Sequence, residues 1–400
     1  ENKNLKIVPG PCMGRCDLAP TVCVGKNYVD NATIKSVEET IRKKEFDALI
    51  PKYSSLDMYI QNGGYKISNK IKDGEITNEQ IIISLKESGL KGKGGAGFPT
   101  GMKWEIVSKY NGKKYVAVNG DEGEPGTFKD RYYLEKDPHR FLEGALIASL
   151  FIKASNVYIY IRDEYPSVIK ILKTEIKQLE NENIIPKGHF VLRRGAGAYI
   201  CGEESAMIES IEGKRGLPRH RPPYVAEVGL FGSPTLTNNL ETLYWIRDII
   251  EKGPKWFADK GVLGNKGFHS FSVSGRVKKP GVKVAPAGIT IQKLIDDYCG
   301  GMVDGHLFKG YLPGGASGGI LPAEKNNIPL DYGSKELSEE GCFLGSAAIV
   351  VLSDKDKMKD VALNLLKFFE EESCGQCTPC RVGTEKTVKL MKQKNWNKDK

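Results

Sequence analysis

The stretch Lys91-Gly-Lys-Gly-Gly-Ala-Gly-Phe-Pro-Thr-Gly-Met-Lys103 contains four glycines within six residues. Glycine lets the backbone reach positive φ and approach a ligand closely, so that several N–H groups can turn inward around an anion. The lysines at positions 91, 93 and 103 add positive charge. We therefore predict a phosphate-binding cradle here, and the alternative is a flexible glycine loop.

Gly92, Gly94 and Gly97 also match the pattern G-x-G-x-x-G. That pattern indicates a dinucleotide site only when it follows a strand. The preceding residues, 78–90, instead have the pattern of a helix that ends in a glycine. A nucleotide cradle of another kind is therefore favoured over a Rossmann site.

Buried strands are predicted at residues 114–119, 156–161 and 189–192, separated by helical patterns at 140–150 and 167–176. Strands that alternate with helices are typical of a parallel sheet. Ligands bind such sheets at the carboxyl ends of the strands. The loops after these strands are therefore the expected place for the chemistry of residues 79–250.

Two of those loops carry paired carboxylates, in Asn119-Gly-Asp-Glu-Gly-Glu-Pro-Gly-Thr127 and in Tyr199-Ile-Cys-Gly-Glu-Glu204. Acidic pairs on loops are usually solvated surface. Beside a basic glycine cradle, however, they can accept hydrogen bonds from ribose hydroxyls or flavin N–H groups. Residues 219–224 add a cation and an aromatic ring on a Pro-Pro frame, and 237–239 add amides.

Residues 251–335 differ in character. In His269–Arg276, Phe271 and Val273 alternate with serines, which predicts a half-buried strand. Thr290 can cap a helix, and Gly310–Ile320 is a glycine-rich loop without nearby charge. We expect a small α+β domain with a purely structural role.

Six of the nine cysteines lie in two groups of three near the ends of the chain. Cys374, Cys377 and Cys380 have the spacing C-x2-C-x2-C, which suits three corners of a 4Fe–4S cluster. Zinc is the alternative, although zinc usually takes two separated pairs. Since no Cys or His follows Cys380, a fourth ligand is expected beyond Lys400.

Cys12 and Cys16 form a C-x3-C pair in a loop rich in glycine and proline. Two thiolates are half the ligand set of a 2Fe–2S cluster. The alternative is that both are small buried side chains. Cys23, which follows in a strand-like segment, is expected to pack in that strand.

Composition narrows the classes of function further. The net charge is +9, but the positive residues are scattered, so nucleic-acid binding is not expected, whereas acidic ligands or subunits are. No run of 18 apolar residues is present, so no membrane insertion is expected. The first residues, Glu1–Lys6, are neither a signal nor a transit peptide. A cytoplasmic chain is therefore predicted, and the missing initiator Met suggests a fragment or processed form.

Four motifs in order, Gly92–Lys103, Asn119–Thr127, Tyr199–Glu204 and Cys374–Cys380, together resemble the NADH-binding flavoprotein subunit of respiratory complex I and its relatives. Those relatives include diaphorase subunits of NAD-dependent formate dehydrogenases and NAD(P)-linked hydrogenases. The resemblance implies an α/β fold in several parts. These are a partial thioredoxin-like 2Fe–2S domain (1–45), an FMN- and NADH-binding parallel-sheet domain (79–250), a β-grasp domain of the SLBB type (251–335) and a truncated helical 4Fe–4S domain (336–400). Residues 46–78 are polar and contain turn sequences at 62–64 and 72–74, which predict a linker or a short-helix connection.

The resemblance also implies roles for individual residues. FMN would be held by Gly92, Gly94, Gly95, Gly97, Lys103, Asn119, Asp121, Glu122, Gly123, Gly202, Glu203, Asn238 and Asn239. The nicotinamide nucleotide would be lined by Phe98, Glu124, Tyr199, Glu204, Arg221 and Tyr224. The chain departs from the family pattern at Lys93, Arg221 and Tyr224, where Arg, Lys and Phe are common. Ile106 replaces an aromatic residue associated with adenine stacking.

The implied function is hydride exchange between the nicotinamide and FMN, followed by electron transfer to the iron–sulfur site, with no catalytic side chain. The N-terminal segment looks most like formate dehydrogenase β subunits. The main prediction is therefore the diaphorase subunit of an NAD-dependent formate dehydrogenase, with NAD(H) and other cluster-bearing subunits as partners. The alternatives are the flavoprotein subunit of complex I or of an NAD-linked hydrogenase and, more distantly, a zinc-bearing nucleotide-binding scaffold.

Overall fold

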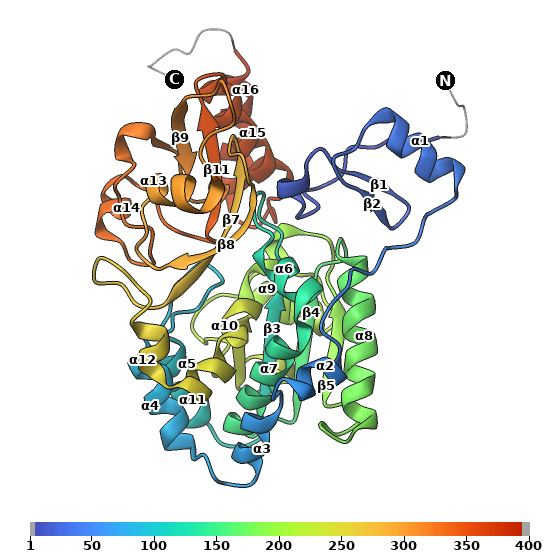
Figure 1. The fold of residues 1–400 in the computed structure, drawn as a ribbon, viewed down its shortest axis with the longest axis vertical. Helices are drawn as coiled ribbons and strands as arrows, with labels where there is room; N and C mark the ends of the chain where they lie inside the picture. The colour runs from blue at the N-terminus through green and yellow to red at the C-terminus, as the bar shows by residue number, and fades with distance from the viewer. Residues whose placement is uncertain (1–4, 394–400) are drawn as a thin grey trace.

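The protein is described by a computed structural model that covers residues 5–393. Its lower lobe is built around a parallel sheet, and its upper lobe around a mixed sheet (Figure 1). The N-terminal segment stands to one side, next to the junction of the two lobes (Figure 1). The loops that the sequence predicts as the nucleotide site follow strands of the parallel sheet.

The parallel sheet has four strands in the order β5-β4-β3-β6. These strands are β3 (Tyr115–Gly120), β4 (Asn156–Ile161), β5 (Phe190–Arg194) and β6 (Thr235–Asn239). The chain leaves β3 for β4 on one side and later returns on the other side as β6, so a topological switch point lies between β3 and β6. The first three strands confirm the predicted parallel sheet, whereas β6 was not predicted, because two of its five residues are asparagines, which are rare in strands.

Helices cover both faces of this sheet. The central one, α7 (Pro138–Ile152), is buried along almost its whole length, and α8 (Pro166–Asn181) packs beside it. Helix α4 (Asn78–Ser88) begins with a capping box at Thr77 and ends at Gly89, whose φ of 68° only glycine adopts easily. This confirms the predicted helix with a C-terminal glycine. The remaining helices of the lobe are α5 (Thr100–Ser108), α6 (Lys129–Lys136), α9 (Glu204–Ile211), α10 (Leu240–Tyr244), α11 (Ile246–Lys252) and α12 (Pro254–Ala258).

The segment predicted as a linker contains two short helices, α2 (Leu56–Gln61) and α3 (Lys66–Lys72). Leu56, Tyr59 and Tyr65 are buried in the core of the lower lobe. This segment is therefore part of the parallel-sheet lobe rather than a free connection.

The mixed sheet has five strands in the order β10-β9-β11-β7-β8. They are β7 (Phe268–Gly275), β8 (Gly281–Pro286), β9 (Phe308–Leu312), β10 (Leu321–Pro322) and β11 (Ala348–Ser353). Two short helices, α13 (Ile291–Lys293) and α14 (Lys335–Glu339), complete the lobe, and Thr290 caps the first as expected. The predicted boundary of this domain was residue 335. Strand β11 follows that residue and lies in the middle of the sheet, so the domain extends beyond the predicted boundary.

Strand β7 is buried on both faces, so the prediction of a half-buried strand is wrong. Phe271 and Val273 pack into the core of the upper lobe, and every residue from His269 to Ser274 is buried. Ser270 and Ser272 are covered by the lower lobe, to which they form hydrogen bonds. The alternation of apolar and polar residues thus separates a hydrophobic core from a polar interface rather than from water.

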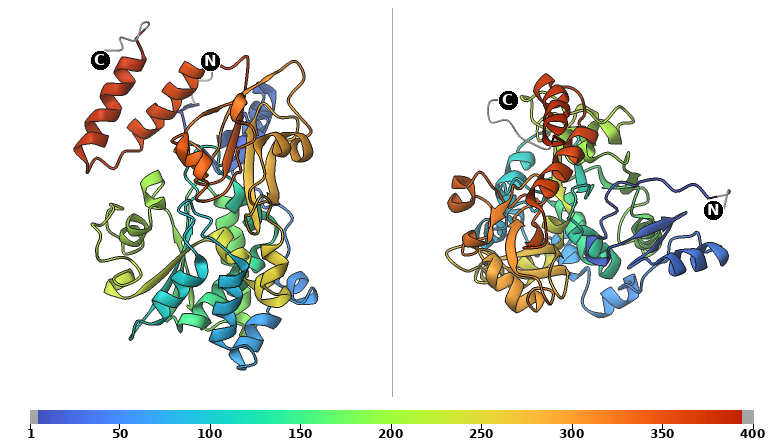
Figure 2. Two further views of the ribbon diagram at one scale, coloured as in Figure 1. Left: turned by 90° about the vertical axis from the view of Figure 1, so that its left-hand side faces the viewer. Right: turned by 90° about the horizontal axis from the view of Figure 1, so that it is seen from above.

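At the C-terminal end, α15 (Met358–Glu371) and α16 (Thr378–Met391) pack side by side at the end of the molecule that holds the mixed sheet (Figure 2). At the other terminus, β1 (Val22–Val24) and β2 (Asn27–Val29) form an antiparallel pair followed by α1 (Ile34–Arg42). None of the helices within residues 5–393 is long and apolar enough to cross a bilayer.

Candidate functional site

Two adjoining cavities lie at the carboxyl ends of β3 and β6, with volumes of about 590 and 350 Å³. Of the nineteen residues predicted to hold FMN or the nicotinamide nucleotide, all but Gly95 line one or both cavities. Gly94, Asn119, Gly202, Glu203 and Asn239 line both and form the boundary between them. The structure thus brings together motifs that lie as much as 140 residues apart in the chain, at the switch point of the sheet.

The glycine-rich segment is a closed loop rather than a flexible one. Its two ends are joined by a hydrogen bond of 2.8 Å from the Gly92 N–H to the Phe98 carbonyl oxygen, and α5 begins directly after it. Gly97 has φ +63°, and a Cβ at that position would lie 2.5 Å from the Cβ of Tyr332. Glycine is therefore required for the shape of the loop.

Of the three lysines around this loop, Lys103 lines the larger cavity and Lys93 borders the smaller one, whereas Lys91 lines neither. The Lys91 ammonium donates to Asp331 over 2.8 Å, and the buried Lys93 ammonium donates to Nδ1 of His269 over 2.9 Å. Both lysines extend behind the loop into the upper lobe. The prediction that all three supply charge to the cradle is therefore wrong for Lys91, which lines neither cavity.

Charged side chains form a chain along one wall of the larger cavity. Lys103 Nζ lies 3.1 Å from Glu204 Oε2, and Arg221 lies 3.6 Å from Glu204 Oε1 and also pairs with Glu203. Glu203 is the N-cap of α9, where its carboxylate accepts the N–H of Ala206 over 2.9 Å. The Glu203 carboxylate thus caps the helix, whereas the Glu204 carboxylate lies between two cations at the cavity.

Phe98, Ile106 and Tyr224 line the same cavity, and between 40 and 58% of each side chain is exposed. Large apolar side chains left in contact with water often mark ligand surfaces. Phe98 and Tyr224 offer flat faces to a planar ring, and Ile106 adds an aliphatic contact. Ile106 fills the position where an adenine-stacking aromatic residue was expected.

In the acidic loop after β3, two of the three carboxylates are already occupied by protein groups. Glu122 accepts hydrogen bonds from the first N–H groups of α6 and from the Tyr165 hydroxyl, and Glu124 accepts from the N–H of Ser317. Asp121 differs, because its Oδ2 is buried without a hydrogen-bond partner among the described residues. Asp121 is therefore the acid of this loop with an acceptor available for a ligand.

Burial raises the pKa of the Asp121 carboxyl to about 7. Since this pKa lies above that of the unfolded chain, the ligand-free protein loses stability as the pH rises from about 4 to about 7. We expect Asp121→Asn to stabilise the ligand-free protein by about 2 kcal/mol at pH 8 and to have little effect at pH 4. Urea denaturation at both pH values measures this difference, and an equal effect at the two would contradict it.

A buried cluster beneath the cavities was not predicted from the sequence. The Lys129 ammonium lies 2.9 Å from Asp130 and 3.0 Å from Glu241, and Asp130 accepts a 2.7 Å hydrogen bond from the Asn239 amide. Lys129 is only 2% exposed. The one signal in the sequence was that Lys129 comes just after the acidic loop. Charged residues in the first turn of a helix usually face water, however, so this position did not predict a buried cluster. The cluster fixes the orientation of Asn239, which lines both cavities.

The cavities have the chemistry that a flavin nucleotide requires. Lys103 supplies a cation, Asp121 an unpartnered acceptor, and the exposed rings apolar contact. A Cβ on Gly94 would lie 3.1 Å from the Cβ of Asn239, so the backbone is left bare where the two cavities meet. The residues present therefore fit FMN.

Comparison with known proteins agrees with this chemistry. Residues 85–248 match the family described as the Nuo51 FMN-binding domain, and residues 360–400 match the NADH-ubiquinone oxidoreductase-F iron-sulfur binding region. An F-type subunit of NADH-quinone oxidoreductase from Rhizobium meliloti (strain 1021) is 42% identical over 353 residues, which cover 86% of this chain and 83% of that protein. The chain belongs to the family of F-type subunits of NADH-quinone oxidoreductase.

Other relatives extend the comparison. The F-type subunit of Aquifex aeolicus (strain VF5) is also 42% identical, over 86% of this chain and 80% of that protein. Among solved structures, NAD+-reducing [NiFe]-hydrogenase in the air-oxidized state has a TM-score of 0.82 at 29% identity, over 96% of this chain and 68% of that chain. The predicted fold class, FMN and 4Fe–4S cofactors and NADH dehydrogenase family are thereby confirmed. These relatives support the complex I alternative better than the main prediction of a formate dehydrogenase.

The cysteines of the iron–sulfur region lie at the junction of α15 and α16. Cys374 is in the connecting loop, Cys377 is the N-cap of α16, and Cys380 lies in its first turn. All three thiols are free, and two of them are exposed. Within residues 5–393, no three Cys, His, Asp or Glu side chains converge tightly enough to hold a metal ion. The donor set itself fits, because three thiolates at a helix N-terminus are suitable ligands for an iron–sulfur cluster.

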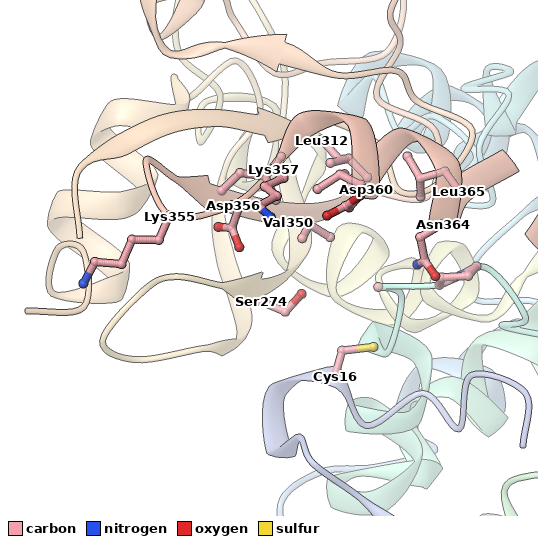
Figure 3. A pocket seen from close by; sticks show the side chains of 14 residues that line it. Cys16, Ser274, Leu312, Val350, Lys355, Asp356, Lys357, Asp360, Asn364 and Leu365 are labelled. Carbon is pink, nitrogen blue, oxygen red and sulfur yellow. The ribbon is translucent and has the colours of Figure 1, made fainter. Parts of the chain in front are cut away.

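The N-terminal cysteine pair lies against the back of the acidic loop. Cys12 Sγ and Cys16 Sγ are 3.6 Å apart, and the hydrogen bond from Cys16 lowers the pKa of the Cys12 thiol to about 6. Figure 3 shows Cys16 on the wall of a cavity of about 680 Å³, opposite Asn364 of α15. The assignment of this pair to a 2Fe–2S site stays a prediction.

Proposed function

We propose that the two cavities are the FMN and NADH sites of a flavoprotein subunit in a multi-subunit redox complex. The observation that carries the proposal is the meeting of the glycine loop, the acidic loop and the Glu203–Glu204 pair at one switch point of the sheet. When bound, FMN accepts a hydride from the nicotinamide and releases the electrons one at a time. The side chains bind and orient the two nucleotides, and none is required as a nucleophile.

Each motif has its own role in this proposal. The glycine loop and Lys103 hold the FMN phosphate, and Asn119, Asn239 and Asp121 provide polar contacts to the flavin. Glu204, between Lys103 and Arg221, receives the adenosine ribose hydroxyls of NADH. The other residues predicted for the two nucleotides, those at the cavities and Gly95, are proposed as contacts on the same grounds.

The purified protein tests this assignment directly. It should be yellow, with flavin absorbance that NADH bleaches under anaerobic conditions. Extraction with acid should release FMN at about one equivalent per chain. Protein that contains zinc but no flavin would support the nucleotide-binding scaffold instead.

We propose that the complex is of the NADH-quinone oxidoreductase type, since the curated relatives are F-type subunits of that enzyme. An NAD+-reducing hydrogenase is the second candidate, because its subunit matches 96% of this chain and so includes most of the N-terminal segment. A formate dehydrogenase is the third. Isolating the native complex and identifying its large subunit, together with assays of quinone, hydrogen and formate, distinguishes the three.

Glu204 is expected to make the enzyme selective for NADH over NADPH. A 2′-phosphate placed near this carboxylate meets a like charge, whereas ribose hydroxyls find an acceptor. We expect Glu204→Gln to free Lys103, to leave Arg221 paired with Glu203, and to raise the ratio of kcat/KM for NADPH to that for NADH by roughly tenfold or more. The ratio is measured with an artificial electron acceptor.

The matched control for this change is Glu227→Gln, which removes a second carboxylate from the lining of the same cavity. Glu227 is exposed and lies outside the chain of charges around Glu204. It should leave the ratio unchanged. An unchanged ratio in Glu204→Gln, with flavin still bound, would contradict the role of Glu204 and leave Glu203 and Glu124 as the candidates for this selectivity.

A further inference from the structure

Strand β7 of the upper lobe contacts three of the segments that surround the cavities: the glycine loop, the end of the acidic loop and the start of α10 after β6. At its start, the Phe268 carbonyl and His269 Nδ1 accept hydrogen bonds of 2.5 and 2.9 Å from the Lys93 ammonium. Further along, the Ser270 hydroxyl donates to Glu241 over 2.7 Å. The hydroxyl of Ser272 then accepts the N–H of Phe128 over 3.0 Å.

Each of these partners lies within two residues of a cavity-lining residue. Lys93 lies between Gly92 and Gly94 of the glycine loop, and Phe128 directly follows the acidic loop. Glu241 follows Asn239 by two residues and also pairs with Lys129 at 3.0 Å. One strand of a separate lobe therefore holds the glycine loop, the end of the acidic loop and the junction of β6 with α10.

These contacts are buried, which makes them strong determinants of geometry. His269, Ser270 and Ser272 are at most 1% exposed, and Lys93 and Glu241 at most 2%. A buried polar group that loses its partner has no water to replace it, so each loop is strongly favoured in the position where its hydrogen bond forms. The relay continues from His269 Nε2, which donates to Asp331 over 2.6 Å, and Asp331 in turn accepts from Lys91.

His269 is suited to accept from Lys93 because it stays uncharged. Burial and the nearby Lys93 ammonium lower the pKa of His269 to about 4. At neutral pH, Nε2 therefore carries the proton given to Asp331, and Nδ1 is free to accept. Lys91 and Lys93, on either side of Gly92, are thus both linked to the His269–Asp331 pair.

We propose that β7 is a positioning element of the flavin site, which fixes these three segments relative to one another and so sets the affinity and environment of FMN. This inference rests on the FMN site proposed above. It gives the upper lobe a part in the flavin chemistry, where the sequence indicated a purely structural domain. Ser270, Ser272 and His269 act through the loops and do not themselves line either cavity.

The test compares serine variants on one face of β7, in the full-length protein within its native complex. Ser270→Ala combined with Ser272→Ala removes two of the contacts and should weaken FMN binding by roughly tenfold. Ser274→Ala is the matched control, because Ser274 is buried on the same face but borders the cavity of Figure 3 instead of the flavin loops. The complex is depleted of FMN and titrated with FMN, and fluorescence quenching gives the dissociation constant.

A second pair of variants addresses the relay at the glycine loop. His269→Leu removes one of the two acceptors for Lys93 and leaves the Phe268 carbonyl, whereas His269→Asn keeps an acceptor close to the position of Nδ1. We expect weaker FMN binding and an altered visible circular dichroism of the bound flavin in the leucine variant, and a partial return toward wild type in the asparagine variant.

The outcomes separate positioning from simple support of the fold. If the serine variants lose stability in urea while their FMN dissociation constants stay within about twofold of Ser274→Ala, β7 is only structural and the inference is wrong. If the double variant does not fold, the single variants decide by the same criterion. If the proposed FMN site itself is wrong, Gly94→Val would also bind FMN with normal affinity. This result distinguishes an error in the proposed site from an error in the inference about β7.

Discussion

Replacing Gly94 with valine is expected to leave the protein without FMN. Gly94 lies where the two cavities meet, and even a Cβ at this position would stand 3.1 Å from the Cβ of Asn239. The two methyl groups of valine would either displace Asn239 or fill the space that the ligand needs. We expect FMN binding to weaken by roughly a hundredfold or more, since several polar contacts are lost together.

The measurement is the flavin content of the purified variant, followed by titration with free FMN. Gly383→Val is a suitable control, because a Cβ at Gly383 meets no atom within 4 Å. It should retain its flavin. A full complement of FMN in Gly94→Val would place the cradle elsewhere in the molecule.

Replacing Cys377 with serine is expected to break the path of electrons out of the flavin and to leave their entry intact. Cys377 is exposed at the start of α16, so the change removes a proposed cluster ligand without disturbing a core. Electron transfer from NADH to the final acceptor should fall by roughly a hundredfold, whereas reduction of FMN by NADH should change by about twofold or less.

Electron paramagnetic resonance of the reduced protein reports the loss of the cluster, and stopped-flow absorbance reports the flavin step. Cys23→Ser is the control, because Cys23 is a half-buried thiol on β1, outside the proposed cluster ligands. Zinc without iron in anaerobically prepared wild-type protein would rule out the iron–sulfur assignment. So would an unchanged cluster signal in Cys377→Ser.

The parts of the fold that were predicted correctly depend on local patterns. The strands β3, β4 and β5 are short apolar runs between turn signals, and α4 has a cap at one end and a glycine at the other. Strand β6 was missed because its pairing with β3 is decided by contacts far away in the sequence. The position of β11 in the middle of the mixed sheet depends in the same way on tertiary packing.

The residues of the candidate site likewise divide into those that local sequence patterns predict and those whose positions depend on tertiary packing. Its glycine and acidic loops were found because each is a compact motif placed after a strand or before a helix. The directions of Lys91 and Lys93 were not, since a side chain beside a glycine loop can extend forward to a ligand or backward to another lobe. The serines of β7 were expected to face water because the sequence contains no sign that a second lobe covers them.

The N-terminal cysteine segment is attached to the lower lobe by a small number of polar contacts, which include ion pairs of Arg131 with Asp17 at 3.0 Å and of Arg15 with Glu135 at 3.6 Å. Arg162 donates to the Cys12 carbonyl over 2.6 Å, Arg131 to the Gly14 carbonyl over 2.8 Å, and the Tyr28 hydroxyl to the Glu164 carbonyl over 2.6 Å. Between two separate molecules, so small a set would give a weak complex that dilution dissociates. Within one polypeptide the connecting residues supply a local concentration in the millimolar range, so that even weak docking is nearly complete at any protein concentration.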